Sequence, residues 1–182
     1  MQGTIHTRSR LWGAVVISAA SAVALSACGS MSSSPKASAT AKLEATKGNS
    51  ANGMVRFDQF DGKVVVSGEI SGLRPNAEHG FHVHDKGDCS SGDGMSTGGH
   101  FNPTTQPHGA HGHGQHHTGD LPSLKADAYG VAKFSFESKS VTVGEGATNV
   151  VGRGLIVHRD PDDLKTQPTG NAGPRVACAV IR

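Results

Sequence analysis

Histidines dominate one stretch of this chain, and their positions point to metal chemistry. Nine of the eleven histidines lie within residues 79–120, and the stretch ends in Asp120. Imidazole is the commonest metal ligand among protein side chains, and carboxylate binds the same borderline ions. A histidine cluster closed by an aspartate therefore predicts a metal centre. The alternative is a solvated histidine-rich loop that takes up metal only opportunistically.

The spacing of these groups favours organised sites. His82 and His84 flank Val83 on an expected strand, so both imidazoles lie on one face and can bind one ion. The further candidate ligands are His100, His108, His117, Asp120 and, after an apolar run, His158. Seven groups complete two four-ligand sites only if one is shared. His100 lies between the two groups in sequence and is the natural bridge, with a cation on each ring nitrogen.

Short strands are the elements expected to position these side chains. Alternating or β-branched runs cover residues 42–46, 54–60, 63–70, 131–136, 154–158 and 175–181. Turn signals separate these runs, and no ten-residue stretch shows a helical period. We therefore expect an all-β domain, a sandwich or a barrel. Two long intervals without strand character, residues 85–122 and 159–174, are expected to carry the function.

Length, composition and charge set broad limits. The 182 residues fit one domain of ordinary size, and 25 glycines with 8 prolines favour turns and short strands over a helical bundle. The net charge of +2 gives no support for a nucleic-acid partner.

Residues 1–27 are predicted to be an export signal. Basic residues precede an apolar run over residues 11–25, which is shorter than the roughly 20 residues of a membrane span. Residues 25–28, LSAC, resemble the lipobox of bacterial lipoproteins, in which the cysteine, here Cys28, carries the lipid. An ordinary signal peptide with an unrelated cysteine is the alternative. Residues 28–39 are small and polar and predict a flexible tether, so the folded domain is expected over residues 40–182.

Two cysteines remain within the domain, Cys89 and Cys178. An even pair in an exported protein favours a disulfide over two free thiols. The bridge would tie the first long interval to the last strand. It would close a ring of about 90 residues, which is worth at most about 4 to 5 kcal/mol on the loop-entropy model.

Four separated motifs make the domain resemble the copper,zinc superoxide dismutase family. They are GFHVH at residues 80–84, GGHFNP at 98–103, HTGDL at 117–121 and GNAGPRVAC at 170–178. The resemblance extends from about residue 41 to the C-terminus, in the family's order. The KGDC run at residues 86–89 and the lipobox make it most similar to the exported bacterial members. It implies a Greek-key β-sandwich or flattened barrel of about eight antiparallel strands with two long functional loops.

The same resemblance implies a role for each candidate residue. Copper would be bound by His82, His84, His100 and His158, and zinc by His100, His108, His117 and Asp120, with one ion of each per subunit. Cys89 and Cys178 would form the family's disulfide. Asp162 would hydrogen-bond one ligand of each metal, and its loss should weaken zinc binding before copper binding.

The implied reaction is the dismutation of superoxide to oxygen and hydrogen peroxide. His100 would be both ligand and proton carrier, and Arg175 would dock the anionic substrate. Thr169 matches a channel residue, and Lys86 is a candidate steering charge. The implied partners are superoxide and, through the lipid on Cys28, a membrane of the cell envelope that the enzyme would protect. A homodimer is compatible with the resemblance, which does not fix how subunits pair.

Several features depart from the family or leave alternatives. Three further histidines, His111, His113 and His116, fit neither ligand set, and a solvated loop is favoured for them over metal collection. Pro168 stands where relatives often carry a lysine, so steering charges would be rearranged. A protein that only buffers or delivers metal is the competing function. Such a protein would be expected to lack Arg175 or a copper ligand, and this chain has both.

Overall fold

The structure, a computed structural model, describes residues 1–4 and 34–182. Nearly all of the predicted export signal, the lipobox with Cys28 and the first half of the predicted tether lie outside the described residues. Within the described segments, no helix has the length and apolar character needed to cross a membrane.

Nine β-strands and one short 3-10 helix make up the regular structure of the described residues. The strands are β1 (Ala37–Ala45), β2 (Asn52–Phe60), β3 (Lys63–Ser71), β4 (Glu78–His79), β5 (Phe81–His84), β6 (Leu124–Lys125), β7 (Ala132–Ser138), β8 (Gly154–His158) and β9 (Arg175–Val180). The helix, η1, spans Met95–Thr97. As predicted, the two long intervals contain little strand.

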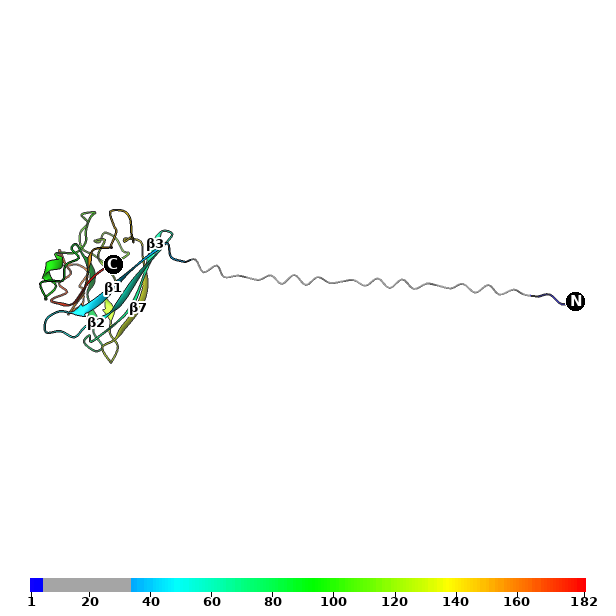
Figure 1. Ribbon diagram of the computed structural model, residues 1–182, viewed down its shortest axis with the longest axis horizontal. Helices are drawn as coiled ribbons and strands as arrows, with labels where there is room; N and C mark the ends of the chain where they lie inside the picture. Colours follow the sequence, from blue (N-terminus) through cyan, green and yellow to red (C-terminus); the bar gives the residue numbers. More distant parts are fainter. Residues whose placement is uncertain (5–33) are drawn as a thin grey trace. The chain divides into compact units, whose positions relative to one another are not determined.

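Seven strands form one antiparallel sheet in the order β5-β8-β9-β1-β2-β3-β7, and β4 pairs with β6 in a separate ribbon. Figure 1 shows β1, β2, β3 and β7 side by side. β9 lies next to β1, which begins the β1–β2–β3 meander, and this order is that of a Greek key. The predicted all-β fold is confirmed.

The sheet folds back on itself at β1. Residues 37–43 of β1 pair with β2, whereas Glu44 and Ala45 pair with β9. The two halves share one apolar core, in which Val55 and Phe57 of β2 and Leu155 and Val157 of β8 are buried.

Burial differs between the two halves in a way that locates the site. β2 alternates between buried and exposed residues, as expected for a strand with one solvated face. β5 and β8 are instead buried at every position, since the long loops cover their outer face. Chemistry on the outer face of β5 and β8 is therefore shielded from bulk water.

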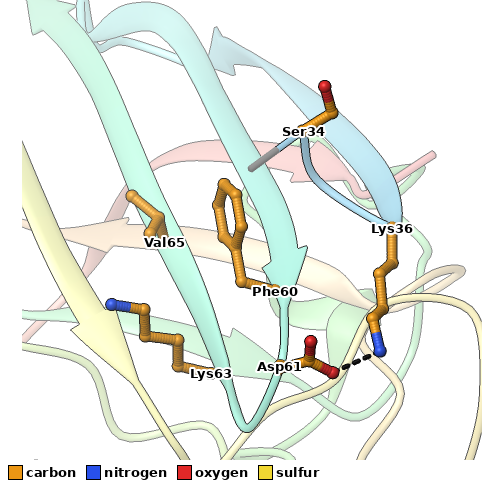
Figure 2. A pocket seen from close by; sticks show the side chains of 6 residues that line it. All are labelled: Ser34, Lys36, Phe60, Asp61, Lys63 and Val65. Carbon is orange, nitrogen blue, oxygen red and sulfur yellow. Dashed lines mark hydrogen bonds and ion pairs between the residues drawn. The ribbon is translucent and has the colours of Figure 1, made fainter. Parts of the chain in front are cut away.

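The folded domain begins earlier than residue 40, which corrects the predicted end of the tether. β1 starts at Ala37, and the Lys36 N–H already donates to the Gln59 carbonyl at 2.7 Å. Lys36 also forms an ion pair with Asp61, beside the surface pocket drawn in Figure 2. The small residues of this segment carry little hydrophobic pattern, but their backbone pairs with β2 and Ala39 is buried.

The predicted disulfide between Cys89 and Cys178 is present. It joins the loop after β5 to β9 across 89 residues of sequence. The same loop supplies the Gly94 and Gly98 carbonyls that accept hydrogen bonds from Arg175 of β9. The disulfide and Arg175 therefore both hold the loop after β5 against β9.

We expect the double variant Cys89→Ser/Cys178→Ser to lose up to about 4 to 5 kcal/mol of its free energy of unfolding, because the unfolded chain regains the entropy of a long loop. Denaturant unfolding followed by circular dichroism measures the change. A reductant should destabilise the wild type and leave the double variant unchanged. An unfolding midpoint equal to that of the wild type would contradict the prediction.

Candidate metal centre

Adjacent strands bring three of the predicted ligands together. His82 and His84 alternate on β5 and lie opposite Ile156 and Gly154 of β8. His158 ends β8, where the register with β9 shifts after Val157. This bulge places Arg175 opposite His158, and bulges commonly redirect side chains in this way.

The loop after β5 folds back onto that strand and brings in the remaining ligands. His100 bridges to His84, and Asp120 bridges to His82. Three backbone hydrogen bonds fix this arrangement: Val83 N–H to the Gly119 carbonyl at 2.9 Å, and Phe101 N–H to Val83 and Gly119 N–H to Phe101 at 2.8 Å each. The ligands on the loop are thus positioned by backbone pairing.

The first ligand group, called here the four-histidine set, consists of His82, His84, His100 and His158. One nitrogen from each ring lies within 4.8 Å of the others, and all four residues are buried. Those nitrogens, Nδ1 of His82 and Nε2 of His84, His100 and His158, are buried without a hydrogen-bond partner. A buried polar atom without a partner is costly, so four converging lone pairs fit a metal ion.

The opposite ring nitrogens of this set are all anchored. Nδ1 of His84 donates to the Gly98 carbonyl and Nδ1 of His158 to the Gly173 carbonyl, each at 2.9 Å. Nε2 of His82 lies 2.6 Å from Asp162 Oδ2. Such bonds fix the tautomer that leaves the inward nitrogen free to bind metal.

The second group, called here the mixed set, consists of His100, His108, His117 and Asp120. Asp120 Oδ1 lies 2.8 Å from His100 Nδ1, 3.1 Å from His108 Nδ1 and 3.3 Å from His117 Nδ1. Zinc–nitrogen bonds of about 2.0 Å in a tetrahedron put ligand atoms roughly 3.3 Å apart. The spacing and chemistry of this set therefore fit a tetrahedral ion. His100 belongs to both sets, with one ring nitrogen in each.

Asp162 connects the two sets. Its Oδ2 lies 2.6 Å from His82 Nε2 in the four-histidine set, and its Oδ1 lies 2.9 Å from His108 Nε2 in the mixed set. The carboxylate is almost fully buried, and the Leu164 N–H also donates to Oδ1. The contacts are those that the resemblance implied for Asp162.

The electrostatics of the metal-free chain differ between the sets. Burial lowers the pKa of His158 to about 3 and that of His100 to about 4, so both rings are neutral at pH 7. Burial would also lower the pKa of His108, but hydrogen bonds to Asp120 and Asp162 raise it to about 9. Metal binding requires neutral imidazole, so an ion entering the mixed set at neutral pH displaces a proton from His108.

Arg175 lies at the edge of the four-histidine set. Its Nη1 donates to the Gly94 carbonyl at 2.6 Å and to Thr97 Oγ1 at 2.8 Å, and its Nη2 donates to the Gly98 carbonyl at 2.7 Å. An arginine has five N–H donors, so two are not used by these bonds. The Gly98 carbonyl also accepts from His84, and it therefore couples a metal ligand to a fixed cation.

The other predicted residues lie outside the two sets. Lys86 is exposed, and its Cδ is 4.0 Å from the Cβ position of Gly98, beside the loop that holds Arg175. Thr169 is half-buried in the turn that precedes Gly170. Their steering and channel roles stay predictions.

Three residues that position ligands were missed by the sequence prediction. Gln167 clamps the backbone of His108: its Oε1 accepts from the N–H at 2.8 Å, and its Nε2 donates to the carbonyl at 2.9 Å. His79 Nδ1 donates to the His158 carbonyl at 2.8 Å. At Gly170, φ is +65° and a Cβ would lie 2.0 Å from Asp162 Oδ1. Gly170 begins one of the four motifs and His79 begins the histidine-rich stretch, whereas Gln167 carried no sequence signal.

Comparison with known proteins agrees with this geometry. A sequence model of the family described as copper/zinc superoxide dismutase (SODC) matches residues 51–181. A "Superoxide dismutase [Cu-Zn]" of Paramecium bursaria Chlorella virus 1 is 42% identical over 156 residues, covering 78% of this chain and 82% of the relative. Another of Saccharomyces cerevisiae is 44% identical over 138 residues, covering 71% and 88%.

A solved structure extends the likeness to the fold. The crystal structure of the clock protein EA4 has a TM-score of 0.73 and 39% sequence identity, and the match covers 82% of this chain and 95% of that one. The two curated relatives come from a virus and a yeast, so the resemblance to exported bacterial members stays a prediction. Since the family model spans most of the folded domain and two relatives exceed 40% identity, the chain belongs to the copper/zinc superoxide dismutase family.

Proposed function

We propose that the four-histidine set binds copper, that the mixed set binds zinc, and that the enzyme dismutates superoxide at the cell envelope. Family membership gives the reaction and the two ions. The observation that carries the assignment of copper is the group of four buried, unpartnered nitrogens. Nitrogen ligands suit copper, whereas three imidazoles and a carboxylate suit a tetrahedral structural zinc.

The ligands of the two sets indicate which groups would exchange electrons and protons with the substrate. A copper ion held by His82, His84, His100 and His158 would supply the one-electron exchange by which one superoxide is oxidised to oxygen and a second, with two protons, is reduced to hydrogen peroxide. His100 keeps Nδ1 in the mixed set, so Nε2 is the atom that can carry a proton to the reduced substrate.

Arg175 is proposed to dock the substrate. Superoxide is an anion, and Arg175 is a permanent cation with two uncommitted N–H donors. Its other donors are fixed by the loop that the disulfide holds, so the guanidinium is ordered before the substrate arrives. Preordered charge reduces the entropy lost on docking.

The envelope location rests on the N-terminal sequence. The apolar run over residues 11–25 behind a basic segment supports export, and Cys28 in LSAC supports lipid anchoring. The Cys89–Cys178 disulfide is consistent with an oxidising compartment. The folded domain would then be attached through a short segment ahead of β1.

We expect Arg175→Ala to lower kcat/KM by roughly ten- to hundred-fold, since it removes a charged hydrogen-bond donor worth about 1.5 to 3 kcal/mol. Superoxide consumption after pulse radiolysis measures the rate, and metal analysis verifies that one copper and one zinc are retained. Lys133→Ala is the matched control because it removes an exposed cation from β7, outside both ligand sets. Full activity in Arg175→Ala would remove the docking role, and an inactive, fully metallated wild type would favour the metal-binding protein.

We expect Asp162→Asn to weaken zinc binding by about ten- to hundred-fold, with a smaller effect on copper. An amide cannot accept from both His82 and His108, and the backbone carbonyls that orient His84 and His158 are unaffected. Chelator competition with metal analysis measures both affinities. Asp163→Asn serves as the control, because Asp163 contacts only its own loop. Equal losses of copper and zinc would contradict the prediction.

We expect full-length protein made in a bacterial host that processes lipoproteins to enter the membrane fraction and to incorporate labelled palmitate. Cys28→Ala should abolish both, because it removes the sulfur that carries the lipid. Cys89→Ser is the matched control, because it removes a cysteine from the folded domain. Wild-type protein without label would disprove the anchor and leave the dismutase assignment intact.

A further inference from the structure

The loop between the mixed-set ligands His108 and His117 carries three more histidines, His111, His113 and His116. None of them belongs to either ligand set. His113 is exposed between two glycines of positive φ, whereas His111 and His116 are partly buried. Two of the three are therefore held by the structure, unlike the solvated loop that the sequence favoured.

His111 and His116 are anchored as metal-binding histidines are. His111 Nδ1 donates to the Asp120 carbonyl at 2.9 Å, and His116 Nδ1 donates to the His117 carbonyl at 2.7 Å. His84 and His158 bond backbone carbonyls through Nδ1 in the same way. This bond fixes the tautomer that leaves a lone pair on Nε2.

The contact at His116 Nε2 agrees with this tautomer. The Gly112 N–H donates to His116 Nε2 at 3.2 Å, so that atom is an acceptor. Both ring nitrogens of His111 face carbonyl oxygens, and the shorter contact, 2.9 Å from Nδ1 to Asp120, takes the single proton of the neutral ring. The 3.4 Å approach of Nε2 to the Glu137 carbonyl is then not a hydrogen bond. A metal ion bound by the two Nε2 atoms would have to replace only the Gly112 N–H at His116 and the distant Glu137 carbonyl at His111.

The separation of the two rings also matches a ligand pair. Their centroids lie 5.5 Å apart, compared with 5.7 Å for His84 and His158 and 5.5 Å for His108 and His117. The edge of Phe136 packs against His111, with centroids 5.7 Å apart, and restrains that ring. The two imidazoles are thus placed before any ion binds.

An open cavity of about 530 Å³ adjoins the pair, lined by His111, Gly112, His116, Glu137, Lys139 and Ser140. Glu137 is already paired with Lys63, and Lys139 adds a positive charge that opposes a cation. The site is therefore suited to an ion held by imidazole nitrogen and exchanged with solvent.

We propose that His111 and His116 form a third, surface metal site for a borderline divalent ion such as Zn²⁺. Imidazole ligands without carboxylate favour zinc, copper or nickel over calcium and magnesium. The site is independent of the assignment of copper and zinc to the buried sets. An ion there would also restrain the backbone of His117 and Asp120, whose carbonyls hold the two rings.

The test is calorimetric titration of the copper- and zinc-loaded protein with ZnCl₂. The wild type should bind one further equivalent, and His111→Asn/His116→Asn should bind it at least ten-fold more weakly. Asparagine is chosen because its amide nitrogen can replace Nδ1 as the donor to the carbonyl while Nε2 is removed. Lys139→Gln is the paired variant and should bind the third ion more tightly.

A second measurement identifies the ligands without substitution. In the reduced holoprotein, nitrogen NMR should show the third equivalent shifting Nε2 of both His111 and His116. A wild type that binds no further zinc, a double variant with wild-type affinity, or unshifted Nε2 signals would each overturn the proposal.

Discussion

The structure depends on one imidazole that belongs to two ligand sets. His100 Nδ1 lies against Asp120, and its Nε2 is buried among the other histidines of the four-histidine set. A single planar ring can serve both only if β5 and the loop that carries His100 keep one fixed register. The backbone pairing through Val83 and Gly119 provides that register. Glycine is required at 119 because a Cβ there would lie 2.2 Å from the Val83 carbonyl.

Burying these groups is costly for the metal-free chain. Imidazoles and carboxylates lose hydration, and several nitrogens find no partner. The free energy that offsets this cost comes from outside the site, from the shared apolar core and the disulfide. Asp162 then makes the two sets dependent on each other, because one carboxylate orients a ligand of each. The other half of the sheet, β1 to β3 and β7, contains none of these groups.

Motifs with fixed spacing were predictable from the sequence, and contacts made only by folding were not. The alternation of His82 and His84 predicted their common face, and the apolar run predicted that His158 would end a strand. Gln167 could not be identified, since its role depends on two loops meeting at the backbone of His108. The start of β1 was misplaced because Ala37–Ala39 pair through backbone rather than through an apolar pattern. His111 and His116 looked solvated because sequence does not show which carbonyls their rings reach.

The bulge after Val157 places the ring of His158 and the guanidinium of Arg175 at paired positions of β8 and β9. It is the shift in register that sets Arg175, rather than its neighbour Val176, opposite His158. Because side chains alternate along a strand, a regular ladder would turn Arg175 to the other face of β9. Grafting the histidines alone onto another antiparallel scaffold would therefore transfer the metal ligands without the guanidinium beside them. A design that is meant to keep this arrangement must therefore copy β8 and β9 together with the register shift between them.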